Sequence, residues 1–208
     1  MARKDLQKRK NWQTASGPAG ASGQAEQNLY SVFEDYFVNT KYELVEQPDD
    51  FKHLYENVVL PESVSNRIYN PTPKDWEHIK KVGWGVKPDF AIKNKETGKI
   101  LFGEIKRQDG WIESTLPKAG RGNAHERLGK LFSPGLIKIY REKSKISSTD
   151  ILPFWVVFEG NITRDPRRNR EIAFWFDKYK HNYFMWYPGA GPEALINHFN
   201  DYLKKYLD

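Results

Sequence analysis

Residues 88–106 read Pro88-Asp-Phe-Ala-Ile-Lys-Asn-Lys-Glu-Thr-Gly-Lys-Ile-Leu-Phe-Gly-Glu-Ile-Lys106, a pattern that is typical of a β-hairpin. Apolar residues dominate Phe90–Ile92 and Ile100–Ile105, and the polar turn between them ends in Gly98. Antiparallel strands joined by such a turn bring residues that are distant in the sequence into direct opposition. The centre of the turn therefore determines which side chains meet.

The acidic residues of this hairpin are expected to meet across it. A turn centred between Glu96 and Thr97 places Asp89 opposite Glu104. Because side chains alternate between the two faces of a strand, Glu104 and Lys106 point the same way. The sequence thus predicts two carboxylates and one ammonium group on a single patch of sheet.

Two like charges that face each other across a strand pair repel and destabilise the sheet. A divalent cation would offset the repulsion between Asp89 and Glu104, and Mg²⁺ prefers oxygen ligands of this kind. Such an ion polarises a phosphoryl oxygen and lowers the pKa of a bound water, while Lys106 stabilises developing negative charge. The same pattern is compatible with a surface hairpin whose acids simply face solvent.

A second segment with candidate functional residues follows the hairpin and reads Gly120-Arg-Gly-Asn-Ala-His-Glu-Arg127. Asn123 with Glu126 three residues later is typical of a helix start, and the helix would continue through Leu128, Leu131 and Phe132. Arginine reads guanine and asparagine reads adenine in the major groove of DNA. An ordinary capped helix with two solvated arginines is the structural alternative.

These residues carry a resemblance to a known family. The stretch 122–127 is similar to the recognition motif of EcoRI-type restriction endonucleases, and Pro88-Asp89, Glu104 and Lys106 resemble their PD-(D/E)XK catalytic core. From about Asn11 onward the chain resembles the MunI/MfeI endonucleases, which cut the palindrome CAATTG. The longer stretches that carry this similarity are 25–30, 102–111 and 152–160. His125 departs from the EcoRI motif, which has an aliphatic residue there.

The resemblance implies a role for each matching residue. Asp89 and Glu104 would bind Mg²⁺, and Lys106 would be the catalytic lysine. Arg121 would read the guanine of the outer C·G pair. The contacts to the inner AATT bases would come from Asn123, Ala124 and Arg127, next to Gly122 in the same motif.

Composition agrees with a nucleic-acid partner. The chain of 208 residues carries a net charge of +6, and its basic residues gather in residues 1–10, 106–130 and 161–170. Phosphate contacts account for much of the affinity of DNA-binding proteins. The chain has no cysteine, so a disulfide framework and a thiolate zinc site are excluded. No apolar run approaches the ~20 residues of a membrane helix, and a cytoplasmic location is the default expectation.

The rest of the chain predicts an α/β fold, with a mixed central β-sheet flanked by helices and the active site at one edge. One endonuclease domain is expected over 1–208, with a mobile basic arm over 1–23. Glu26, near the start of the first helix, is interpreted as a solvated glutamate of the first turn, and a supporting acid beside the active site is the alternative. The expected helices cover 24–38, 61–70, a segment starting at Ser133-Pro134, and 192–206, and the expected strands cover Ile151–Phe158, Glu171–Phe176 and Tyr183–Trp186.

A palindromic site has a consequence for assembly. One protomer reads half of the site and cuts one strand, so a twofold homodimer is expected. A DNA methyltransferase for the same site is expected in the same system, without direct contact. Two other readings remain open: a PD-(D/E)XK nuclease with a repair or structure-specific task, and a DNA-binding module without catalysis.

Overall fold

The computed structural model describes residues 21–49, 61–68, 70–81, 86–107, 124–159, 166–186 and 190–208. The chain divides into two compact units, one comprising residues 1–46 with 89–208 and the other Gln47–Pro88. The single endonuclease domain over 1–208 stays a prediction. The basic arm expected over 1–23 lies almost entirely outside the described residues.

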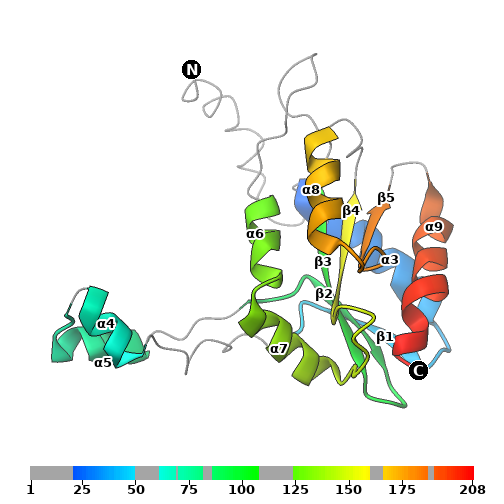
Figure 1. Cartoon of the computed structure of the whole chain (residues 1–208). Helices are drawn as coiled ribbons and strands as arrows, with labels where there is room; N and C mark the ends of the chain where they lie inside the picture. The colour runs from blue at the N-terminus through cyan, green and yellow to red at the C-terminus, as the bar shows by residue number, and fades with distance from the viewer. Residues whose placement is uncertain are drawn as a thin grey trace. The chain divides into compact units, whose positions relative to one another are not determined.

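Within the described residues, the larger unit is built on one mixed β-sheet (Figure 1). Its strands are β1 (Tyr42–Glu46), β2 (Phe90–Asn94), β3 (Ile100–Arg107), β4 (Phe154–Glu159) and β5 (Tyr183–Trp186). They lie side by side in this order; β1, β2 and β3 are antiparallel, and β3, β4 and β5 are parallel. This confirms the predicted mixed sheet and its last two strands, whereas β1 was not predicted.

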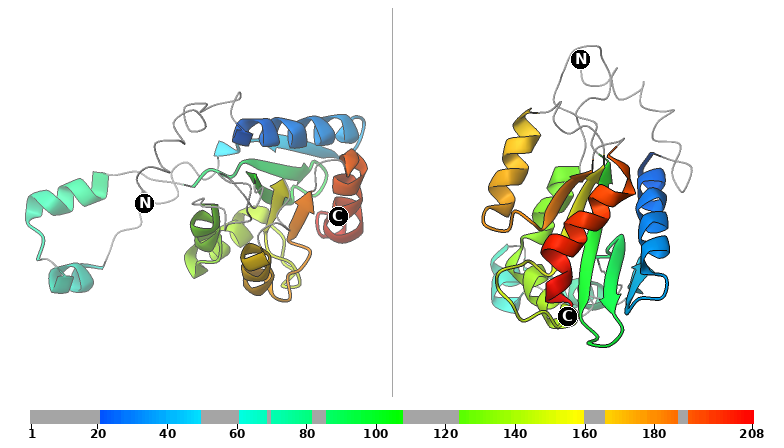
Figure 2. Two further views of the ribbon diagram at one scale, coloured as in Figure 1. Left: turned by 90° about the horizontal axis from the view of Figure 1, so that it is seen from above. Right: turned by 90° about the vertical axis from the view of Figure 1, so that its right-hand side faces the viewer.

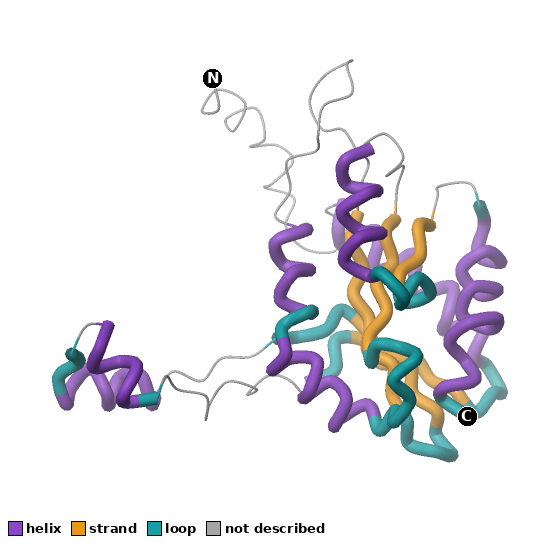
Figure 3. Tube along the Cα trace, viewed as in Figure 1, coloured by secondary structure: helices purple, strands orange, loops and turns teal. Residues whose placement is uncertain are grey.

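Helices cover both faces of this sheet, as Figures 2 and 3 show. They are α3 (Ala21–Phe37), α6 (Ala124–Leu131), α7 (Pro134–Ser144), α8 (Pro166–Phe176) and α9 (Gly191–His198). Adjacent residues of β4 point to opposite faces of the sheet and contact different helices. The Trp155 ring packs on Phe33 of α3, and the Phe154 ring packs on Tyr140 of α7 and Phe176 of α8. None of the described helices is long and apolar enough to cross a membrane.

The β2–β3 hairpin has the predicted register. Phe90 pairs with Gly103 and Ile92 with Leu101, which places Asp89, just before β2, level with Glu104. The turn is held by Asn94, whose fully buried side chain accepts from the Glu96 N–H at 2.9 Å and donates to the Leu207 carbonyl at 3.0 Å. The C-terminal end of the chain therefore braces the turn that sets the hairpin register.

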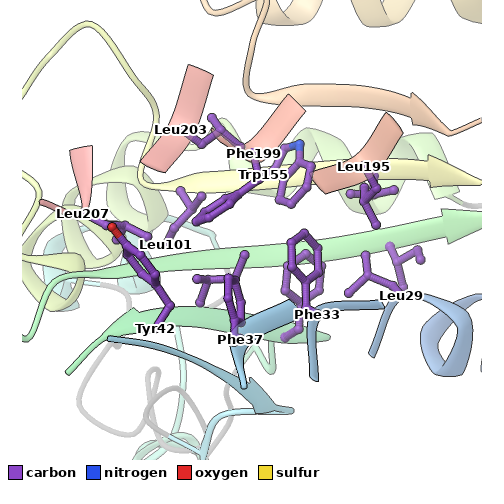
Figure 4. Packing of buried hydrophobic residues seen from close by; sticks show 14 of the residues in the cluster. Leu29, Phe33, Phe37, Tyr42, Leu101, Trp155, Leu195, Phe199, Leu203 and Leu207 are labelled. Atoms are coloured by element: carbon purple, nitrogen blue, oxygen red, sulfur yellow. The ribbon is translucent and has the colours of Figure 1, made fainter. Parts of the chain in front are cut away.

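The main hydrophobic core lies between the sheet and the layer of α3 and α9 (Figure 4). Phe33 of α3 is fully buried, with its ring centroid 5.9 Å from that of Trp155 and 5.8 Å from that of Phe199. The same helix buries Leu29 and Phe37, as predicted from its apolar stripe. This packing fixes α3 against the sheet along most of its length.

The segment Glu171–Phe176 is helical, and its prediction as a strand was wrong. It forms the second half of α8, which begins at Pro166. In a strand, Ile172 and Phe174 would share one face, yet Ile172 is 3% exposed and Phe174 is 82% exposed. Ile172 and Phe176 are buried instead, which is the spacing of a helix. Proline at the first helical position was the missed signal.

Two other predicted helices are confirmed in the larger unit. Ser133 caps α7 by accepting from the Leu136 N–H, and Pro134 follows at the first position. The closing helix starts as α9, continues as a π-helix over Phe199–Leu203 and ends as a 3₁₀ turn over Lys204–Tyr206. Leu195, Phe199 and Leu203 are buried on one side, as predicted, and Tyr206 is partly buried against the same core.

The smaller unit contains two short helices. The first, α4 (Glu62–Ile68), confirms the helix predicted after Pro61, and the second, α5 (Pro73–Lys81), was not predicted. Thr72 and Asp75 cap α5 reciprocally: the Asp75 carboxylate accepts from the Thr72 N–H at 2.9 Å, and Thr72 Oγ1 accepts from the Asp75 N–H at 3.3 Å. The Thr72 hydroxyl also donates to the Asp75 carboxylate at 2.7 Å, and this hydrogen bond, together with the one from the Thr72 N–H, holds the pKa of Asp75 below its usual value.

The hairpin register generates a testable prediction at Gly103. A Cβ atom there would lie 2.1 Å from the Phe90 ring, which is fully buried and packs on Trp155. We expect Gly103→Ala to lower the free energy of unfolding by roughly 1–3 kcal/mol through overpacking. In a Phe90→Leu background the same change should be less destabilising. Urea denaturation of the four proteins of this double-mutant cycle measures the difference.

Gly129→Ala is the matched control, because a Cβ atom at that position in α6 has nothing within 4 Å. This variant should be neutral or stabilised, by up to about 1 kcal/mol. An equal loss of stability for Gly103→Ala in the presence and absence of the Phe90 ring would contradict the proposed clash.

Candidate functional site

Asp89, Glu104 and Lys106 converge at the edge of the sheet where β2 begins and β3 ends. The Lys106 Nζ lies 2.6 Å from Glu104 Oε2 and 3.1 Å from Asp89 Oδ2. It also donates to the Ile105 carbonyl oxygen at 3.0 Å. The predicted convergence of two carboxylates and an ammonium group is therefore present in the structure.

The strands explain why these side chains meet. Glu104 and Lys106 lie on the same face of β3 as Phe102, whose ring packs on Tyr140 of α7. Asp89 lies in the bend just before β2, and its Oδ2 accepts from the Ile105 N–H at 2.8 Å. This hydrogen bond ties the Asp89 carboxylate to β3, although Asp89 is not part of the paired strand.

Burial shapes the electrostatics of this trio. The side chains of Asp89, Glu104 and Lys106 are 22%, 13% and 17% exposed. Burial raises the pKa of the Glu104 carboxyl, and the charge of Asp89 raises it further, while Lys106 acts in the opposite direction. For Lys106, burial alone would lower the pKa, but the two carboxylates outweigh it and the pKa is raised. Lys106 therefore remains a cation in this site.

The donor set fits a hard divalent cation. It offers the Asp89 and Glu104 carboxylates and the Ile105 carbonyl. All three groups supply oxygen ligands, and all three lie within hydrogen-bond distance of the Lys106 Nζ. Among the described residues, no group of three or more His, Cys, Asp or Glu side chains could hold a metal ion. A metal here would rely on two carboxylates, a main-chain carbonyl and water, which is the kind of site that Mg²⁺ accepts.

Glu26 of α3 is half-buried and interacts electrostatically with Asp89 and Lys106, which favours the alternative of a supporting acid over a solvated glutamate. Burial raises the pKa of Glu26, followed by the negative charge of Asp89, while Lys106 lowers it and Glu46 raises it. Glu26 lies four residues before Tyr30, on the core-facing side of the helix. That spacing was the sequence signal for its inward position.

Two contacts from α3 to this edge were not predicted. The Tyr30 hydroxyl donates to the Asp89 carbonyl oxygen at 2.6 Å. The Asn28 side-chain amide donates to Glu159 Oε1, at the end of β4, at 3.1 Å. Both pairs are far apart in the sequence, and no local pattern indicates them.

The predicted DNA-reading residues are only partly within the described chain. Arg121, Gly122 and Asn123 lie outside the described residues, and so do the side chains of Ala124 and Arg127. Helix α6 begins at Ala124, directly after the expected cap, and buries Leu128 and Leu131. The helix predicted downstream of Asn123 is confirmed, whereas its contacts with bases stay a prediction.

Comparison with known proteins identifies close relatives. The family model "Type II restriction enzyme MunI" matches residues 1–208. The type II restriction enzyme MunI of a Mycoplasma species is 58% identical over 208 residues, and the match covers 100% of each chain. The crystal structure of the MunI restriction endonuclease in complex with cognate DNA matches with a TM-score of 0.74 and 57% identity. That match covers 95% of this chain and 98% of the other.

Proposed function

The chain belongs to the family of the type II restriction enzyme MunI, and on this premise we propose that it cuts both strands of double-stranded DNA at CAATTG with Mg²⁺. Membership makes the chain a site-specific deoxyribonuclease. The convergence of Asp89, Glu104 and Lys106 on one sheet edge carries the proposal for where the reaction takes place.

Mg²⁺ would be held by the Asp89 and Glu104 carboxylates, with the Ile105 carbonyl as a further oxygen ligand. When bound, it supplies a Lewis acid that polarises a phosphoryl oxygen and lowers the pKa of a coordinated water. Type II restriction enzymes generally depend on a divalent metal, and the oxygen-only donor set at this site favours Mg²⁺ among them.

Lys106 would act on the reacting phosphate. In the hydrolysis, a water oxygen forms a bond to phosphorus, the bond from phosphorus to one sugar oxygen breaks, and that oxygen takes up a proton. Negative charge builds up on the phosphate oxygens in the transition state, and a fixed ammonium group stabilises it. Because Lys106 remains charged between two carboxylates, it can perform this role or orient the attacking water.

Recognition of CAATTG would come from the segment that leads into α6. Arg121 would read the guanine of the outer pair, and the contacts to AATT would come from Asn123, Ala124 and Arg127, next to Gly122. Arginine and asparagine have the hydrogen-bonding groups for these bases. Glu104 and Lys106 share a sheet face with Phe102, whose ring packs on Tyr140 of α7, and α7 directly follows α6 in the chain.

The proposed partners follow from the symmetry of the site. A palindrome presents the same half-site twice, so a twofold homodimer would place one active site on each strand. A host must protect its own CAATTG sites, which calls for a methyltransferase of the same specificity in the same system. Both proteins would work in the cytoplasm, where the DNA is.

The first test is the digestion of a plasmid with a single CAATTG site, beside a plasmid without one. We expect linearisation of the first plasmid alone, with Mg²⁺ and not with EDTA. Cleavage of both plasmids would point to a PD-(D/E)XK nuclease with another task. Cleavage of neither, by folded protein that still binds DNA, would favour a binding module.

Asp89→Asn and Lys106→Ala test the catalytic assignment. Each should abolish cleavage while sequence-specific binding of a CAATTG duplex persists, because neither residue belongs to the proposed reading set. Gel-shift and cleavage assays on the same preparations measure both properties. Asp35→Asn and Lys138→Ala, at exposed helical positions, are the matched controls and should cleave normally. Retained cleavage by Asp89→Asn or Lys106→Ala would show that the catalytic site lies elsewhere.

Arg121→Ala tests the reading of the outer base pair. A bidentate contact to guanine contributes roughly 1–3 kcal/mol of discrimination, so the preference for CAATTG over GAATTC should fall by a corresponding factor. Both duplexes contain AATT, so the ratio of their binding constants removes any general loss of affinity. An unchanged ratio would exclude Arg121 from the reading set.

A further inference from the structure

Asp89 is the one member of the catalytic trio that lies outside a regular strand. It occupies the bend before β2, whereas Glu104 and Lys106 lie within β3. Its carboxylate is held from the side of β3, by the Ile105 N–H at 2.8 Å and Lys106 Nζ at 3.1 Å. Its main chain precedes Phe90, which pairs with Gly103 and Glu46, and it has one further contact on the side of the helices.

Tyr30 of α3 makes that contact. Its hydroxyl donates to the Asp89 carbonyl oxygen at 2.6 Å, and the tyrosine is 3% exposed. The carbonyl is approached from the α3 side of the sheet, while the carboxylate of the same residue faces the Lys106 side. Asp89 is therefore held at two points, one on each side of the sheet.

The helix that carries Tyr30 is itself well anchored. Phe33, three residues further along, packs on Trp155 and Phe199 in the main core. Asn28, two residues earlier, donates to Glu159 at the end of β4. These contacts attach α3 to β4 both before and after Tyr30 in the sequence. The Tyr30 hydroxyl therefore has a defined position relative to the sheet.

We propose that Tyr30 is a positioning residue for the metal site: its hydrogen bond to the Asp89 carbonyl holds the Asp89 carboxylate in the orientation that binds the divalent cation. This inference rests on the proposed role of Asp89 and Glu104 as metal ligands. Tyr30 acts through Asp89 and touches neither metal nor DNA. Loss of its hydroxyl should weaken metal binding without changing which DNA sequence is recognised.

Tyr30→Phe removes one oxygen atom and leaves the aromatic ring in the core. Two measurements follow: Mn²⁺ binding to the DNA-free protein, from the electron paramagnetic resonance signal of free Mn²⁺, and the Mg²⁺ concentration for half-maximal cleavage of a CAATTG duplex. Both midpoints should rise by about tenfold, which corresponds to ~1.4 kcal/mol. The cleavage rate at saturating Mg²⁺ should recover most of the wild-type value.

Tyr36→Phe is the matched control on the same helix. The Tyr36 hydroxyl accepts from the Asn200 side-chain amide at 2.7 Å, so Tyr36→Phe, like Tyr30→Phe, removes one hydrogen bond that involves a tyrosine hydroxyl. It should show a comparable fall in melting temperature and unchanged metal midpoints. Incorporation of 4-aminophenylalanine at position 30, which restores a donor at the ring end, should return the metal midpoints toward wild type.

Asp89→Asn separates failure of this inference from failure of the proposed metal site. If Asp89→Asn loses Mn²⁺ binding while Tyr30→Phe binds Mn²⁺ as the wild type does, Tyr30 has no positioning role. If Asp89→Asn binds Mn²⁺ normally, the metal site itself is misplaced. Equal shifts in Tyr30→Phe and Tyr36→Phe would also overturn the inference, because they would reflect stability alone.

Discussion

The repulsion between Asp89 and Glu104 is the constraint around which the sheet edge is organised. Two unit charges about 4 Å apart at an effective dielectric constant of about 20 interact with ~4 kcal/mol, which is comparable to the net stability of a small domain. The Lys106 ammonium, 2.6 Å from one carboxylate and 3.1 Å from the other, adds two attractions against that single repulsion. A divalent cation would attract both carboxylates more strongly than the ammonium group does. The charge distribution of the site therefore favours the binding of cations.

The remainder of the larger unit keeps this cluster in place. The hairpin turn is held by the buried Asn94 side chain and by the C-terminal end of the chain, through the Leu207 carbonyl. Gly103 leaves room for the Phe90 ring, which allows the two strands to keep the register that aligns the acids. From the opposite side of the sheet, Tyr30 ties the Asp89 main chain to a helix anchored in the aromatic core. The geometry of the proposed catalytic site is thereby coupled to core packing.

Sequence patterns predicted those parts of the structure that depend on residues close together in the chain, such as turns and helix caps. The hairpin register followed from the turn and strand pattern, and the start of α7 from its Ser133-Pro134 cap. The strand predicted over Glu171–Phe176 was wrong because a short run of apolar and aromatic residues is compatible with a strand or a helix. Only the burial of its side chains in the folded protein distinguishes the two. The contact between Tyr30 and Asp89 spans 59 positions, and no sequence spacing reveals a hydrogen bond of that kind. The assignment of DNA-reading residues stays a prediction from the sequence motif, since Arg121 to Asn123 lie outside the described residues.

We propose that a divalent cation binds where the hairpin register brings Asp89 and Glu104 together. Anomalous diffraction from crystals of the protein with Mn²⁺ and a CAATTG duplex would locate the ion. We expect an anomalous peak within coordination distance of both carboxylates and of the Ile105 carbonyl oxygen. Mn²⁺ bound at a different group of residues, with Asp89 and Glu104 still paired only to Lys106, would contradict it.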